Sequence, residues 1–139
     1  MAEEPQLKNA INGSIKLFES DGLPVALRLL DDAIAEFARQ GLNLPVTTLC
    51  HHAAVLCSVA ESLPLQRHYF ELSLTHNPGN FRALYGLARV SLDEGQTDLA
   101  RKYAQQSVDA IMASDDPLAH SWLELIDKNW PGLVRPPQA

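Results

Sequence analysis

Long apolar runs are missing from this sequence, and so is an excess of basic residues. No window approaches the roughly 20 consecutive apolar residues that a membrane-spanning helix needs. Lysine and arginine total 11 against 17 aspartates and glutamates, which gives a formal net charge of −6. Nucleic-acid backbones are bound by clustered Lys and Arg side chains, and no such cluster occurs here. We therefore expect a protein that binds neither membranes nor nucleic acids.

Cysteine is scarce as well, with Cys50 and Cys57 as its two occurrences. They lie seven residues apart on one expected helix, so their Cα atoms are separated by about 10 Å along its axis. That separation is larger than a disulfide tolerates, and we expect two free thiols. The acidic start of the chain, MAEEPQLK, has no apolar run of the kind found in secretory signals. These features predict a cytoplasmic protein.

Arrangements of catalytic or metal-binding residues are also lacking. The sequence has no glycine-rich phosphate loop and no G-x-S-x-G motif. Cys50, Cys57 and a neighbouring histidine are zinc-type ligands, but the two thiols are too far apart along one helix to share a tetrahedral ion. Buried free cysteine instead behaves as a small apolar residue. We predict no enzyme activity, no metal and no cofactor.

Helical periodicity is what the sequence does contain, and no segment alternates apolar and polar residues as a strand would. Proline, glycine and capping residues delimit the segments. Asn80, Thr97 and Asp116 are the expected N-caps, and Pro117 stands at a first helical position. The pattern predicts seven helices, over residues 6–20, 24–40, 46–62, 64–75, 81–94, 98–113 and 117–129.

Apolar and small residues repeat with a spacing of 34 in the middle of the chain. One set consists of Leu84, Leu87, Ala88, Ser91, Ala100, Ala104, Ser107 and Val108. Subtracting 34 gives Cys50, Ala53, Ala54, Cys57, Gln66, Phe70, Ser73 and Leu74. Seven of the eight pairs match in apolar or small character, and the exception is Gln66, a larger polar residue opposite Ala100. Each half of a set has helical spacing, so each helix offers one apolar face to a partner helix.

These residues resemble the tetratricopeptide repeat family, whose unit is a helical hairpin of 34 residues. The matching repeats cover residues 7–40, 47–80 and 81–114, with 117–129 as a cap. The first repeat stays in register only with the insertion GLNLPV, and Glu61 replaces the turn glycine of the second. The resemblance implies an all-α fold, a right-handed superhelical stack of about three hairpins plus a capping helix. We expect this stack to form one domain over residues 1–130, followed by a proline-rich tail over residues 131–139.

The resemblance also implies where a partner binds, because the first helices of successive hairpins line a concave groove in this family. By position, the groove-facing residues are Lys8, Ile11, Ile15, Phe18, Thr48, His51, Val55, Ser58, Arg82, Tyr85, Arg89 and Leu92. Arginine side chains at one end are able to bind a carboxylate, and exposed aliphatic side chains at the other need a partner. Ile11 and Ile15 stand where chaperone-binding members carry polar clamp residues, which argues against that particular function.

Three occupants of this face are compatible with the sequence. The first is a peptide or partner protein, which makes the chain an interaction module, in a scaffold, adaptor or co-chaperone-like role. The second is another copy of the chain, which pairs through the apolar N-terminal helix face to form a homodimer. The third is one of the chain's own terminal segments.

The stretch SLDEGQTDLA, residues 91–100, suggests a cation-binding loop at first sight, since three carboxylates surround Gly95. A calcium loop of this kind needs a glutamate six residues past its glycine, and Arg101 stands there instead. The same residues are those of a tight turn between two helices, with Gly95 at the bend and Asp98 in the first turn of the next helix. We predict a turn.

Overall fold

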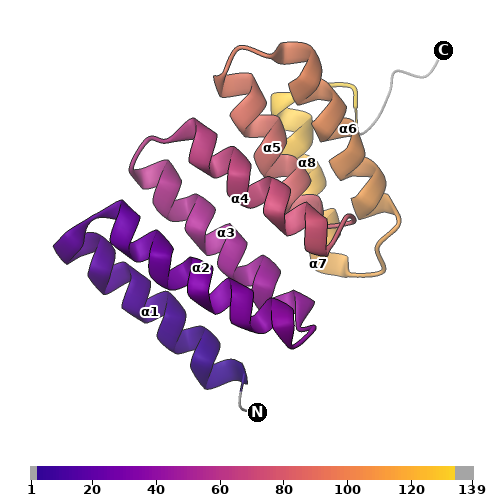
Figure 1. Cartoon of the computed structure of the whole chain (residues 1–139). Coiled ribbons are helices and arrows are strands. Elements are labelled where there is room, and N and C mark those ends of the chain that lie inside the picture. The colour runs from indigo at the N-terminus through magenta and orange to yellow at the C-terminus, as the bar shows by residue number, and fades with distance from the viewer. Residues whose placement is uncertain (1–2, 134–139) are drawn as a thin grey trace. The chain divides into compact units, whose positions relative to one another are not determined.

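The computed structural model describes residues 3–133, and every secondary-structure element in that range is a helix. The prediction of an all-α chain is confirmed over these residues. The helices are α1 (Glu3–Asp21), α2 (Leu23–Arg39), α3 (Asn43–Val59), α4 (Leu63–His76), α5 (Phe81–Asp93), α6 (Thr97–Met112), α7 (Pro117–His120) and α8 (Trp122–Asn129). Contacts divide the chain into two compact units, Met1–Asn77 with α1 to α4 and Pro78–Ala139 with α5 to α8 (Figure 1).

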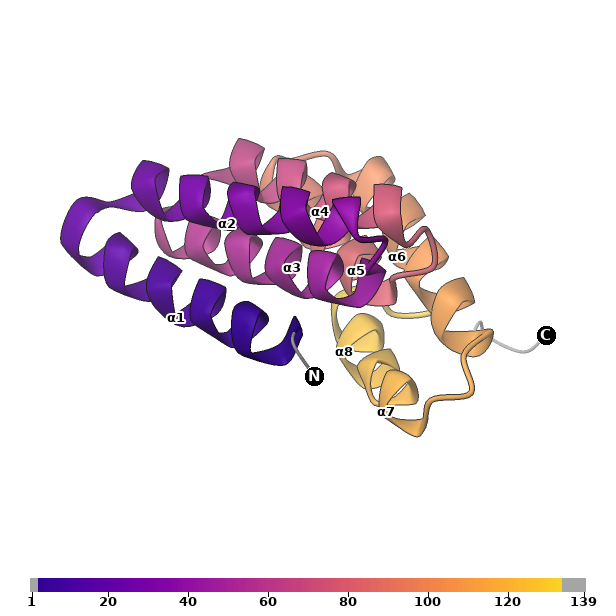
Figure 2. The same ribbon diagram turned by 60° about the horizontal axis from the view of Figure 1, so that its bottom comes forward.

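Unit 1 consists of two helical hairpins, α1 with α2 and α3 with α4. Helices α2 and α4 lie on one side of the unit, and α1 and α3 lie on the other (Figure 2). The core between them contains small side chains that are almost completely buried. Its fully buried members include Ala26, Leu30, Leu49, Cys50, Ala53 and Cys57. Small residues at these positions allow neighbouring helix backbones to approach closely, while the leucines fill the remaining space.

Unit 2 is built on one hairpin, α5 with α6, to which α7 and α8 return. Its core again combines alanine with larger aliphatic residues. The buried members of this cluster are Ala88, Ala100, Ala104, Val108, Ile111, Ala119, Ile126 and Trp130. Ser107 is fully buried on α6, and its hydroxyl donates to the backbone carbonyl of Phe81 on α5 at 2.9 Å. This bond ties the end of α6 to the start of α5.

The residues that repeat at a spacing of 34 lie largely in these cores. All eight members of the later set are buried, from Leu84 to Val108. In the earlier set, Cys50, Ala53, Ala54, Cys57 and Ser73 are buried, whereas Gln66, Phe70 and Leu74 are only half-buried. Gln66 is also the one residue whose character departs from the pattern. The spacing therefore identified the inward face of α3, α5 and α6. It was less accurate for α4, where the buried large side chain is Tyr69, which lies outside the set.

Helix boundaries differ from the expected ones by one to three residues at several places, including the start of α1 at Glu3 and the end of α3 at Val59. Helix α3 begins at Asn43 rather than residue 46, because Pro45 is tolerated in a first helical turn. Thr97 is the first residue of α6, and Gln96 is its N-cap. The expected seventh helix is interrupted at Ser121, whose hydroxyl donates to the carbonyl of Leu118 at 2.6 Å. A serine that bonds to the backbone in this way competes with the regular helical pattern. The N-caps Asn80 and Asp116 are confirmed.

Three helices end in the same turn, in which one residue adopts a left-handed conformation. That residue is Gly41 after α2, Glu61 after α3 and Gly95 after α5, with φ values of 72°, 60° and 80°. In each turn the following residue donates its amide to a carbonyl five positions earlier, at 3.0, 2.9 and 2.8 Å. The turn predicted at Gly95 is thus confirmed. Glu61 is the only non-glycine residue with positive φ among residues 3–133.

Glu61 is therefore a strained position, because a left-handed backbone costs a residue with a side chain about 1 kcal/mol more than it costs glycine. We expect Glu61→Gly to raise the free energy of unfolding by about 1 kcal/mol, as measured by urea denaturation. The reverse substitution at the equivalent turn position after α5, Gly95→Glu, is the matched control. No atom lies within 4 Å of a Cβ placed on Gly95, so this change should lower stability through the backbone alone, by a similar amount. A destabilised Glu61→Gly variant would contradict this reading of the turn.

Candidate functional site

The residues expected to line a groove are divided between the two units. Those of unit 1 lie on α1 and α3, and we call the set Lys8, Ile11, Ile15, Phe18, Thr48, His51, Val55 and Ser58 the α1–α3 face. Those of unit 2 lie on α5, namely Arg82, Tyr85, Arg89 and Leu92. The two sets have different surroundings, and each is described within its own unit.

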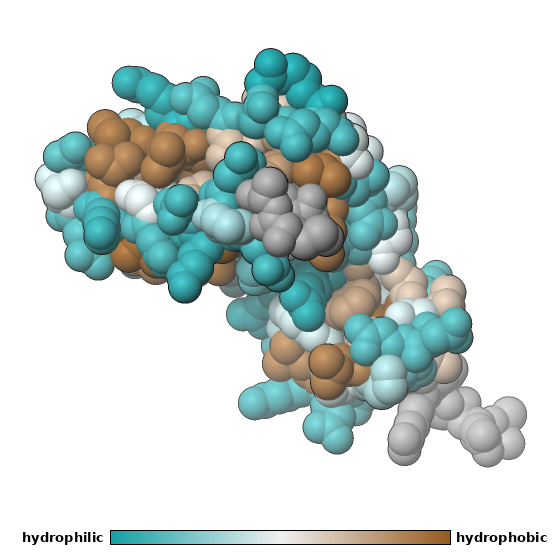
Figure 3. Space-filling model, turned by 90° about the horizontal axis from the view of Figure 1, so that it is seen from below, coloured by the Kyte–Doolittle hydropathy of each residue, from teal (hydrophilic) through white to brown (hydrophobic). Residues whose placement is uncertain are grey.

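The α1–α3 face exposes apolar side chains to solvent. Ile15 is 38% exposed on α1, and Val55 is 46% exposed on α3. Ile11 and Phe18 are partly buried against the core of unit 1. Figure 3 shows unit 1 from below, where apolar side chains lie between hydrophilic ones. Of the eight residues of the face, only Lys8 carries a permanent charge, so the face favours an apolar binding partner.

Two further apolar residues extend α3 toward solvent, and the position-based expectation missed them. Val59 is 65% exposed, one turn beyond Val55, and Leu44 is 77% exposed near the start of the helix. The spacing of four between Val55 and Val59 was the signal that places both on one side of α3. Leu44 was missed because it lies outside the helix that was expected to begin at residue 46. Helix α3 begins three residues earlier, at Asn43, and includes Pro45.

A hydrogen bond links the two helices beneath this face. The Ser14 hydroxyl on α1 donates to the carbonyl of Ile11 at 2.7 Å, so its oxygen accepts from Nε2 of His52 on α3 at 2.9 Å. Ser14 is fully buried and His52 is half-buried. Burial lowers the pKa of His52 below its ordinary value, and the neighbouring His51 lowers it further. The neutral imidazole therefore holds α1 beside α3.

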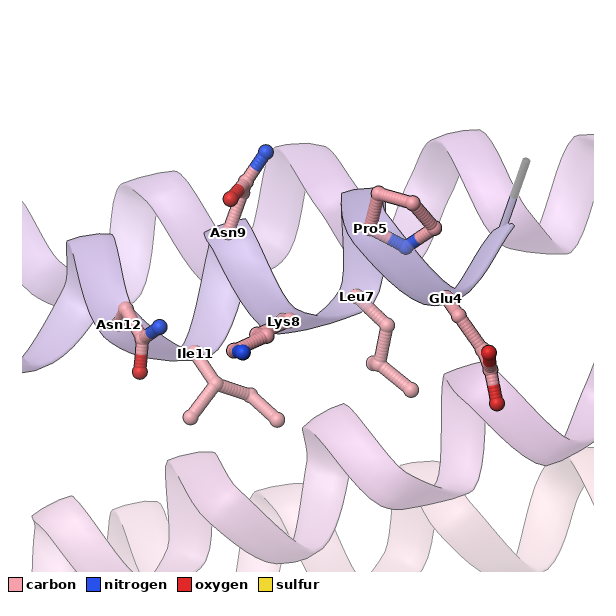
Figure 4. A pocket seen from close by; sticks show the side chains of 7 residues that line it. All are labelled: Glu4, Pro5, Leu7, Lys8, Asn9, Ile11 and Asn12. Carbon is pink, nitrogen blue, oxygen red and sulfur yellow. The ribbon is translucent and has the colours of Figure 1, made fainter. Parts of the chain in front are cut away.

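A pocket of about 740 Å³ opens along the N-terminal half of α1. Its lining residues on this helix are Glu4, Pro5, Leu7, Lys8, Asn9, Ile11 and Asn12. Figure 4 shows Leu7 and Ile11 pointing toward the neighbouring helix, whereas Asn9 points away from it. Because Lys8 and Ile11 belong to both sets, this pocket continues the α1–α3 face toward the start of the chain.

The groove-facing residues of α5 contact α8 of the same unit. The Tyr85 ring packs edge-on against Trp122 and Trp130, with centroids 5.5 and 6.2 Å apart. Arg89 donates to Oδ1 of Asn129 at 2.8 Å, and burial raises the pKa of Tyr85 although Arg89 opposes that shift. These side chains are thus engaged within unit 2, by the chain's own C-terminal segment.

Arg82 remains exposed at the edge of this cluster. Its guanidinium carbon lies 5.9 Å from the ring centroid of Phe81 and 5.7 Å from that of Trp122, in cation–π contact with both. Phe81 and Trp122 also meet edge-on at 5.7 Å. Leu92 is half-buried against the core of unit 2. Arg82, Tyr85 and Arg89 therefore stabilise the return of α8, which the sequence predicted as part of the capping helix over 117–129.

The two cysteines are free and buried in the core of unit 1, so the prediction of two thiols is confirmed. Burial raises the pKa of Cys50 to about 12 and that of Cys57 to about 11, and the charge of Asp31 contributes to both shifts. Both side chains are thus neutral thiols packed as small apolar groups. Across residues 3–133, no three His, Cys, Asp or Glu side chains form a group suited to a metal ion. None of the helices in that range is long and apolar enough to cross a membrane.

The His52 pKa predicts a pH-dependent contribution to stability. A histidine whose pKa is lowered by folding binds fewer protons folded than unfolded, so its stabilising effect is complete above its unfolded pKa of about 6.5 and declines as the pH falls below that value. We expect the stability difference between the wild type and His52→Gln to shrink between about pH 7.5 and about pH 5.5. Urea denaturation at each pH measures it. The control is His68→Gln, at an exposed histidine. Stability profiles against pH that stay parallel for wild type and His52→Gln would show that His52 does not contribute this pH dependence.

The aromatic contacts of α8 predict a large effect of truncating Trp130, which is 6% exposed. We expect Trp130→Ala to lower the free energy of unfolding by about 3 kcal/mol or more, because it leaves a cavity against Tyr85 and the α6 alanines. Met112→Ala, at a position that is 62% exposed, should change stability by less than about 0.5 kcal/mol. Thermal or urea unfolding distinguishes the two, and equal effects would show that α8 does not cover α5.

Comparison of the chain with protein-family models, curated proteins and solved structures finds no match. Its likeness to the tetratricopeptide repeat therefore remains a resemblance based on the 34-residue spacing of small and apolar residues.

Proposed function

We propose that this chain is a protein–protein interaction module whose α1–α3 face binds an apolar segment of a partner protein. The observation that supports it most directly is the exposure of Ile15, Val55 and Val59 on two helices that a buried hydrogen bond holds side by side. Adjacent exposed apolar side chains on a folded surface mark interaction sites more often than isolated ones do. The pocket along α1 gives such a segment a recess to enter.

The proposal narrows the binding surface expected from the repeat family. In a superhelical stack of tetratricopeptide type, which we retain as part of the proposal, both units line one groove. The α5 residues Tyr85 and Arg89 already have partners on α8, so the available binding surface in our proposal is that of unit 1. A scaffold or adaptor role in the cytoplasm is consistent with such a surface.

A second candidate function is self-association through the same face. Its supporting observation is the near absence of charge, since Lys8 is the only permanently charged residue among the eight. Two copies can therefore place this face against itself without like-charge repulsion, in the isologous manner usual for homodimers. Sedimentation velocity of the purified chain over a range of concentrations separates the two functions, because only self-association makes the measured mass depend on concentration.

We expect Val55→Glu to abolish partner capture, because a partner that covers this face would have to bury an unpaired carboxylate. Val55 is 46% exposed, so the folded chain itself should tolerate the change. The measurement is quantitative affinity capture from lysate, with bound proteins compared between wild type and variant. Leu118→Glu, at a position that is 71% exposed in unit 2, is the matched control and should retain the partner. Equal capture by Val55→Glu and wild type would exclude this face.

A further inference from the structure

A cleft on the opposite side of unit 1 is separate from the α1–α3 face. It lies between the N-terminal halves of α2 and α4 and has a volume of about 570 Å³. Pockets that bind small organic molecules span roughly 300–1,000 Å³, so this cleft has a suitable size. Its lining residues are Leu23, Pro24, Leu27, Arg28, Asp31, Leu65, His68 and Tyr69, all within unit 1.

The floor of the cleft is apolar, and a hydrogen bond fixes the position of its aromatic side chain. Tyr69 is 2% exposed, and its hydroxyl donates to Oδ1 of Asp31 at 2.8 Å. Because the hydroxyl is satisfied in this way, the ring presents carbon atoms to the cleft. Leu27 is buried beside it, and Leu23 and Leu65 add aliphatic walls. The His68 ring meets Tyr69 edge-on, with centroids 4.8 Å apart.

The cleft has two charged residues on α2, and the positive one, Arg28, is nearer to the start of the helix than the negative one, Asp31. Arg28 precedes Asp31 by one turn of α2, and within residues 3–133 its guanidinium has neither a hydrogen bond nor an ion pair. The Asp31 carboxylate is instead engaged by the Tyr69 hydroxyl. Neither α2 nor α4 has an acidic residue in its first turn, so the field of the helix ends adds to that of Arg28.

We propose that the cleft between α2 and α4 binds a small apolar molecule with one carboxylate, a medium-chain fatty acid in type. The Arg28 guanidinium pairs with the carboxylate through two parallel hydrogen bonds. The apolar chain lies on Leu27 and the Tyr69 ring, between the walls formed by Leu23 and Leu65. This site is independent of the proposed protein-binding face, because the two sets of lining residues share no member.

The probe is decanoate, titrated into the full chain below its micelle-forming concentration. Calorimetry measures the affinity, and amide chemical shifts locate the site. We expect saturable binding with shifts at Leu27 and Leu65, and a loss of affinity of about tenfold or more in Arg28→Gln. Arg39→Gln is the matched control, because Arg39 lies on the same helix but pairs with Glu36 outside the cleft. Its affinity should equal that of the wild type.

Two further comparisons make the outcome decisive. Leu65→Glu introduces a carboxylate into the apolar wall and should eliminate binding, while decanol, which lacks the charge, should bind at least about tenfold more weakly than decanoate. The proposal is overturned if Arg28→Gln binds decanoate as tightly as the wild type, or if decanol binds equally well. It is also overturned if a peptide with a C-terminal leucine binds the cleft and decanoate does not.

Discussion

Close approach of helix backbones, made possible by small buried side chains, is the constraint on which the rest of this structure depends. In unit 1, Ala26, Cys50, Ala53 and Cys57 are all fully buried. Larger residues there would push the helices apart and force a different packing. Because these small residues determine which side of each helix faces inward, they also determine which sides remain outside. The α1–α3 face and the α2–α4 cleft are two of the surfaces that this packing leaves outside.

Much of this packing could be predicted from the sequence because it follows a period. The spacing of 34 placed Leu84, Leu87 and Ala88 on an inward face, and each is buried. The same spacing was less informative for α4, where Phe70 and Leu74 match the pattern but are only half-buried. Periodic patterns are informative because each helix must bury one stripe of its surface whatever its partner is. The turn at Gly95 was predictable for a related reason, since glycine adopts positive φ without strain.

Other features could not be predicted, because they depend on contacts between distant residues. Nothing in the spacing of Trp122 identified the Tyr85 ring as its neighbour. The bond between Arg89 and Asn129 spans 40 positions of the sequence. The cleft beside Arg28 is a similar case, since it exists only because Tyr69 and Asp31, 38 positions apart, meet in space. A periodic pattern names the side of a helix that is buried, and it carries no information about which distant side chain covers it.

We propose that the α1–α3 face is the surface through which this chain binds another protein. Its most direct test is a photo-reactive amino acid placed at Val55 of the full chain, with Met112 as the exposed reference position in unit 2. Illumination in lysate, followed by mass spectrometry, records what each position touches. We expect one dominant protein joined to position 55 and none enriched at position 112. Labelling that is absent at position 55, or equal at both positions, would contradict it.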